Sequence, residues 1–125
     1  MKRENGPMFS EDGEKTTLAE LLAKMPENNW NWYLYDFEGI GIAPEGMDMQ
    51  AFENLVVTQT YGYPFCWLSL KAFCSTLTDV RSCLLAAVKH PVDYELLESK
   101  EGSDVLALIR IDDSTAWEIK LSEVL

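Results

Sequence analysis

The spacing of apolar residues along the chain predicts three helices. Thr17 and Glu20 form a capping-box pattern, and apolar residues follow at helical spacing until Pro26. Asp48 is placed to cap a second helix, which has apolar residues on one side. The longest helix is expected over residues 77–90, where apolar residues recur at helical spacing after a second capping-box pattern.

Other segments are aromatic-rich, β-branched or alternating, and they predict strands. The expected strands cover residues 30–37, 61–73, 92–97, 105–111 and 115–121. Turns are expected at residues 44–46, 100–103 and 112–114. Residues 105–111 are apolar on both faces and should be central, whereas residues 115–121 should have one face in water.

The predicted helices are too few and too irregularly placed for a doubly wound parallel sheet. We therefore expect an α+β fold of two layers, with a mixed or mainly antiparallel sheet and about three helices packed on it. The chain has 125 residues, which is enough for one core without disulfides or metals. Residues 1–15 are polar and are expected to be a flexible tail, followed by a single α+β domain over residues 16–125.

The net charge is −11, and its distribution along the chain bears on the kind of partner that the protein binds. There is no Lys or Arg between Lys24 and Lys71, an interval that holds six acidic residues and ten of the fourteen aromatic residues. Interleaved aromatic and acidic side chains can form a protein-binding face, since aromatic rings supply contact area and carboxylates select a basic partner. Two simpler interpretations remain: most of the aromatic residues belong to the core, and the acidity only keeps the protein in solution.

Candidate catalytic and metal-binding residues are scarce. The only histidine is His90, interpreted as a helix C-terminal residue, and the three cysteines, Cys66, Cys74 and Cys83, form no C-x-x-C motif. The cysteines are interpreted as small, reduced, buried residues, and a Cys–His nucleophile is not favoured. We therefore expect no enzyme activity, no metal and no cofactor.

The acidic charge also disfavours direct binding to nucleic acids and to anionic membranes. The first residues lack the apolar stretch of a secretory signal, and we expect a cytoplasmic protein with no membrane contact. The oligomeric state is left open.

In composition the chain resembles bacterial immunity proteins and antitoxins, many of which are small, acidic and non-catalytic and bind basic nucleases. The resemblance implies a protein that neutralises a basic partner, such as a toxin, by occupying its phosphate-binding cleft. The residues expected to bind the partner are Tyr33, Tyr35, Asp36, Glu38, Glu45, Asp48, Glu53, Tyr61 and Tyr63. Should the interface lie elsewhere, the next candidates are Asp93, Glu95, Asp112 and Glu118.

Two alternatives stay open. The protein is a phage or host regulatory adaptor that binds some other protein, or it is a small enzyme or ligand-binding domain. The second alternative requires an aromatic pocket around Trp30, Trp32 and Trp67.

Overall fold

A computed structural model shows one antiparallel sheet and describes residues 2–97 and 105–122. Within these residues the sheet has six strands in the order β1-β6-β5-β4-β2-β3. The strands are β1 (Lys2–Pro7), β2 (Asn31–Ile40), β3 (Tyr63–Phe65), β4 (Asp79–Val88), β5 (Val105–Asp112) and β6 (Ala116–Leu121).

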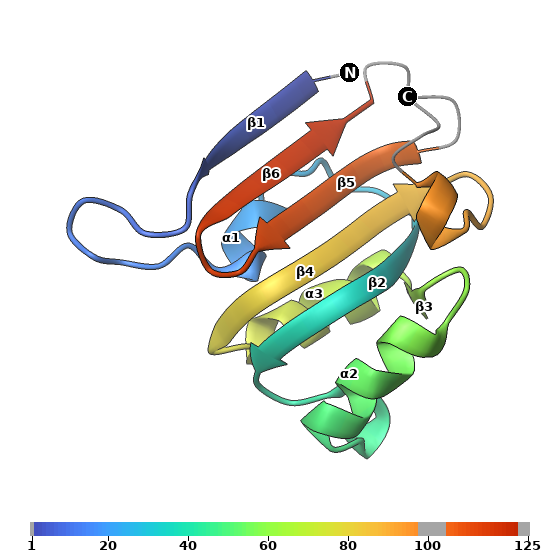
Figure 1. Cartoon of the computed structure of the whole chain (residues 1–125). Helices are drawn as coiled ribbons and strands as arrows, with labels where there is room; N and C mark the ends of the chain where they lie inside the picture. The colour runs from blue at the N-terminus through green and yellow to red at the C-terminus, as the bar shows by residue number, and fades with distance from the viewer. Residues whose placement is uncertain (1, 98–104, 123–125) are drawn as a thin grey trace.

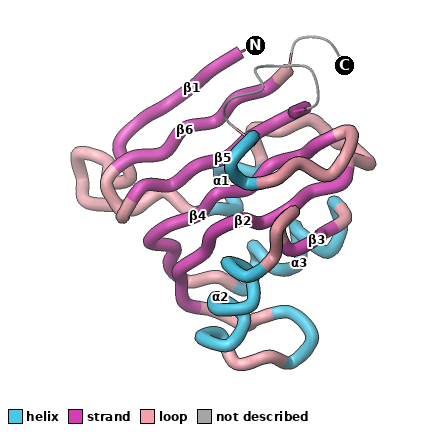
Figure 2. Tube along the Cα trace, turned by 45° about the vertical axis from the view of Figure 1, so that its right-hand side comes forward, coloured by secondary structure: helices cyan, strands magenta, loops and turns pink. Residues whose placement is uncertain are grey.

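The helices are α1 (Leu18–Leu22), α2 (Met49–Thr58) and α3 (Trp67–Thr76), and short 3₁₀ turns lie at Pro44–Gly46 and Tyr94–Leu96. Figure 1 shows α1 and α3 behind the sheet, and Figure 2 shows the strands as one layer. The predicted two-layer α+β fold is confirmed. No helix of the described segments has the length and apolar character needed to cross a bilayer.

The first two helices begin where the sequence predicts. The Thr17 hydroxyl accepts a hydrogen bond from the backbone N–H of Glu20 (3.1 Å), and the Glu20 carboxylate accepts one from the Thr17 N–H (3.3 Å). Asp48 accepts a hydrogen bond from the Ala51 N–H (3.3 Å) at the start of α2. These side chains satisfy backbone donors that have no partner within the helix.

Residues 79–88 form strand β4, so the helix predicted over residues 77–90 is wrong. The six residues from Cys83 to Val88 are all buried, because β4 lies between β2 and β5 and both of its faces are covered. Cys83, Leu85 and Ala87 belong to the core under the helices, while Leu84 and Val88 belong to a second cluster on the other face. A continuous apolar run fits either a helix or a doubly buried strand, and here it forms the strand.

The converse error occurs at residues 61–73, predicted as a strand. Only Tyr63–Phe65 forms a strand, at the sheet edge where Pro64 is tolerated, and α3 begins at Trp67. Within α3, Trp67, Leu70, Phe73 and Cys74 are buried, which is the spacing of one helix face packed on the sheet.

The N-terminal segment also differs from the expected polar tail. Lys2–Pro7 pairs along its length with β6, and the following Met8 is fully buried and donates its N–H to the Thr115 carbonyl (3.0 Å). The side chains of Lys2–Pro7 are mostly exposed, so backbone pairing with β6 rather than burial defines the strand.

The C-terminal predictions have mixed outcomes. Strand β5 is central and almost wholly buried, and β6 follows it through a turn in which Asp113 and Ser114 have positive φ angles, as in a type I′ turn. Residues 92–97 do not form a strand: Tyr94–Leu96 is a 3₁₀ turn. The turn predicted at 100–103 lies outside the described residues.

Candidate functional site

The sheet face opposite the helices is partly covered by the segment that follows β4. The hydroxyl of Tyr35 donates a hydrogen bond to the carbonyl of Val92 (2.6 Å), and the rings of Tyr35 and Tyr94 lie 6.2 Å apart. Burial, with smaller contributions from Tyr33 and Asp93, raises the pKa of Tyr35 to about 12. Tyr35 is therefore a neutral anchor that fixes residues 92–94 on the sheet.

A bulge in β2 places Asp36 on the same face as Tyr35. The register between β2 and β4 shifts between Leu34 and Asp36, so Leu34 and Phe37 face the helices while Tyr35 packs in the opposite cluster. Asp36 follows directly and is half-buried. The bulge thus places an anchor and a carboxylate next to each other.

A hollow of about 450 Å³ lies between the C-terminal end of α2 and residues 93–95. Val57 on α2 and Tyr94 are 61% and 55% exposed, and both line this hollow. The lining residues are Tyr35, Asp36, Val57, Thr58, Gln59, Thr60, Asp93, Tyr94 and Glu95.

A second hollow of about 420 Å³ continues across β4 and β5 towards the β5–β6 turn. The two hollows share Asp36 and Tyr94, and we call them together the acidic groove. The second hollow is lined by Asp36, Ser82, Cys83, Leu84, Tyr94, Arg110, Ile111, Asp112 and Asp113.

Carboxylates dominate the charge of the acidic groove. Its charged lining residues are Asp36, Asp93, Glu95, Asp112 and Asp113, together with Arg110. Beside the second hollow, the Arg81 guanidinium contacts Asp113 (2.7 Å) and Glu38 (3.6 Å), and these contacts raise the pKa of Arg81. The first hollow has three carboxylates and no basic lining residue, so it is the more negative of the two.

The register of the sheet explains how Asp36 and Arg110 share a face. Leu84 on β4 pairs with Asp36 on one side and with Arg110 on the other, and Arg110 pairs with Glu118 on β6. The Arg110 guanidinium lies 4.0 Å from the Glu118 carboxylate. Residues from four strands thus form one row across the sheet face opposite the helices.

The structure brings only some of the predicted partner-binding residues to the groove. Asp36 and Tyr35 line it, and Glu38 is exposed beside it. Tyr33 is half-buried against the apolar cluster that contains Tyr35. Tyr35 is 4% exposed, so the expectation that its side chain is an exposed contact is wrong. Tyr61 is 51% exposed but does not line either hollow.

The remaining predicted residues stabilise local structure around α2. Glu53 accepts a hydrogen bond from the Gly39 N–H (2.9 Å), Glu45 accepts one from the Tyr63 hydroxyl (3.2 Å), and Asp48 caps the helix. These carboxylates therefore belong to a different part of the surface from the groove.

Of the fallback candidates, Asp93, Glu95 and Asp112 line the groove. Sequence reasoning missed Tyr94, because residues 92–97 were interpreted as a strand rather than as a turn. An aromatic residue between two acidic residues after Pro91 was the available signal.

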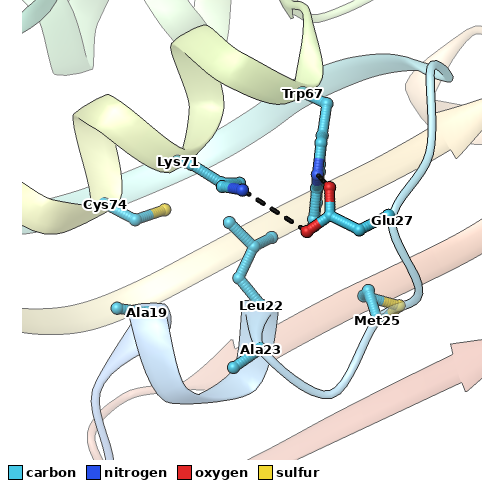
Figure 3. Close-up of a pocket in the computed structure, with 8 residues that line it drawn as sticks. All are labelled: Ala19, Leu22, Ala23, Met25, Glu27, Trp67, Lys71 and Cys74. Carbon is cyan, nitrogen blue, oxygen red and sulfur yellow. Dashed lines mark hydrogen bonds and ion pairs between the residues drawn. The ribbon is translucent and has the colours of Figure 1, made fainter.

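The tryptophan pocket of the ligand-binding alternative is only partly formed. Trp32 is fully buried and stacks on Trp67 (5.7 Å), and Trp67 lines a hollow. This hollow of about 350 Å³ lies between α1 and α3 (Figure 3). At its rim Glu27 accepts a hydrogen bond from the Trp67 indole N–H (3.0 Å) and pairs with Lys71 (3.5 Å). The hydrogen bond from the indole, with a smaller contribution from Lys71, lowers the pKa of Glu27.

The cysteines and His90 form no recognisable catalytic group. Cys74 and Cys83 are buried, and burial raises the pKa of each thiol, whereas Cys66 is exposed at the start of α3, contrary to the prediction that all three are buried. Hydrogen bonds from Ser69 lower the pKa of Cys66. His90 is exposed after β4 rather than at a helix end, and no metal-binding cluster of three side chains occurs in the described segments.

Comparison with known proteins adds no assignment. No protein-family model matches the sequence, and no match was found among curated proteins or solved structures.

Proposed function

We propose that this protein is a non-catalytic binding protein that neutralises a basic protein partner, in the manner of an immunity protein or antitoxin acting on a nuclease. The observation that supports the proposal is the acidic groove, where five carboxylates accompany one guanidinium in the lining. A nuclease cleft is basic because it holds phosphates, and a carboxylate-lined surface is complementary to it.

The groove also has features that hold a partner after encounter. Tyr94 and Val57 are exposed apolar surface on opposite walls. Tyrosine is common among residues that contribute most to binding energy, and charged residues around it act mainly on the association rate. The proposed partner is thus attracted by charge and retained by contact with Tyr94.

The proposal is tested with a panel of purified basic nucleases and a matched panel of acidic nucleases. Binding is measured by biolayer interferometry, and nuclease activity is titrated with the protein. We expect at least one basic nuclease to bind and to lose activity at a stoichiometric ratio, with an association rate that falls as salt rises, because exposed charges are screened beyond about 8 Å at physiological ionic strength.

Charge reversal locates the interface. Glu95→Lys, in the groove, should lower the association rate, whereas Glu11→Lys, an exposed glutamate outside the groove lining, should change it much less. Binding without loss of nuclease activity favours the adaptor alternative. Failure of every basic nuclease to bind contradicts the proposal.

A ligand-binding function is the second candidate, and the hollow between α1 and α3 favours it. Its volume of about 350 Å³ and its lining of Leu22, Met25 and Trp67 suit a small apolar ligand. A thermal-shift screen of apolar carboxylates and amines tests it, with Leu22→Trp as the variant that fills the hollow. A ligand that raises the melting temperature of the wild type and not of the variant supports this candidate.

A further inference from the structure

The hollow between α2 and residues 93–95 has the features of a receptor for one long cationic side chain. Val57 and Tyr94 give it apolar walls, and Asp36 lies in its lining at the junction with the second hollow. Arginine and lysine combine an apolar stem with a charged end, so one such side chain matches both parts of the hollow.

The carboxylate of Asp36 is available for an external cation. It is half-buried, and no hydrogen bond or ion pair joins it to another residue in segments 2–97 and 105–122. By contrast, Asp93 accepts a hydrogen bond from the Glu95 N–H (2.9 Å), and Asp113 pairs with Arg81. Asp36 is therefore the groove carboxylate that combines partial burial with a free bonding capacity.

Tyr94 is held in position before any partner arrives. Its N–H donates to the carbonyl of Thr60 (3.4 Å), and its ring lies against the ring of the buried Tyr35. The Tyr35 hydroxyl in turn holds the carbonyl of Val92. Binding to a fixed aromatic ring costs less conformational entropy than binding to a mobile one.

The same sheet face already holds a guanidinium between two carboxylates. Arg81 lies between Glu38 and Asp113, beside the second hollow. That hollow is also lined by Arg110, whose positive charge repels a second cation, whereas the first hollow has no basic residue in its lining. The first hollow is thus the one in which every charged lining residue is acidic.

We propose that this hollow binds an arginine side chain of the basic partner, with the guanidinium paired to Asp36 and stacked on Tyr94. This inference rests on the proposed function and names the group that the protein recognises. Arginine is favoured over lysine, because a planar guanidinium stacks on an aromatic ring and forms two parallel hydrogen bonds with one carboxylate.

The test compares fluorescently labelled octa-arginine, octa-lysine and octa-citrulline at low salt by anisotropy. We expect octa-arginine to bind about fivefold more tightly than octa-lysine, from stacking on the ring. Asp36→Asn should weaken octa-arginine binding about tenfold, as expected for a lost charge-assisted hydrogen bond. Octa-citrulline, which is neutral, should not bind.

Tyr94→Leu should abolish the preference for arginine, and Tyr61→Leu, at an exposed tyrosine outside the hollow, should retain it. Urea denaturation of each variant checks that the fold is intact. Should Tyr94→Leu fold poorly, amide chemical shifts of the wild type decide instead: arginine-dependent shifts should concentrate at residues 57–60 and 93–95.

The outcomes separate this inference from the proposed function. Equal binding of octa-arginine and octa-lysine, unaffected by Tyr94→Leu, contradicts the arginine receptor and leaves the acidic binding protein in place. Shifts centred on the hollow between α1 and α3 also contradict it. Inhibition of a basic nuclease is tested independently, and its absence contradicts the proposed function.

Discussion

Replacing Tyr35 by phenylalanine removes one hydroxyl from the contact that fixes residues 92–94 on the sheet. The hydroxyl donates a 2.6 Å hydrogen bond to the Val92 carbonyl, and the side chain is 4% exposed. Phenylalanine keeps the ring but leaves the carbonyl without this donor, so we expect a loss of about 1–2 kcal/mol in the free energy of unfolding at pH 8. In a domain of this size that loss lowers the melting temperature by roughly 4–8 °C.

The same contact predicts how the effect changes with pH. The pKa of Tyr35 is raised from 10.0 to about 12 in the folded protein, chiefly by burial. A raised folded pKa means that the stabilisation is complete below the unfolded pKa and is lost as pH rises from about 10 to about 12, because only the unfolded state then releases the proton. The advantage of the wild type over Tyr35→Phe should therefore shrink between pH 9.5 and pH 11.5.

Urea denaturation followed by tryptophan fluorescence at several pH values measures both effects. Tyr61→Phe is the matched control, since Tyr61 is 51% exposed, and it should change the free energy of unfolding by less than about 0.5 kcal/mol. Ionisable groups that the two proteins share contribute to both free energies of unfolding and largely cancel in the difference. A difference between wild type and Tyr35→Phe that is absent at pH 8, or that stays constant up to pH 11.5, would refute the assigned role of Tyr35.

Three further predictions concern the fold. Leu85→Ala should lower the free energy of unfolding by about 2–5 kcal/mol in urea denaturation, because Leu85 is fully buried in the centre of β4; a loss below 1 kcal/mol would contradict its core position. Thr17→Ala should lower the free energy of unfolding by about 1 kcal/mol because it removes the cap of α1, and Thr17→Ser should keep most of the wild-type stability. Gly39→Ala should lower the free energy of unfolding by about 1–3 kcal/mol, since an added Cβ would lie 2.7 Å from the Asp79 carbonyl oxygen. A variant as stable as the wild type would show that β2 and β4 move apart there at little cost.

The candidate site was only partly predictable from the sequence. The acidic and aromatic composition indicated a binding face, and Asp36 was among the residues named for it. Asp93 and Asp112 were named only as fallback candidates, and their grouping with Asp36 could not be derived. The three residues lie far apart in the chain, and the pairing of β2, β4 and β5 and the segment that follows β4 bring them to one groove. Tyr94 joins them because Tyr35 binds the carbonyl of Val92, a contact between residues 57 positions apart.

The sequence by itself determined the features that depend on neighbouring residues. The cap at Thr17, the cap at Asp48 and the hairpin turn at Asp113 and Ser114 each involve side chains or backbone angles within a few positions. The central place of β5 was also predictable, because both of its faces are apolar.

The tertiary structure decided the elements whose local pattern is ambiguous or weak. Residues 83–88 are apolar without interruption, so they carry no period that separates a helix from a strand, and burial between β2 and β5 makes them a strand. Lys2–Pro7 is polar and mostly exposed, and only the open edge of β6 makes it a strand. Hydrogen bonds and buried area supplied by distant segments outweigh the fractions of a kcal/mol per residue that separate local conformational preferences.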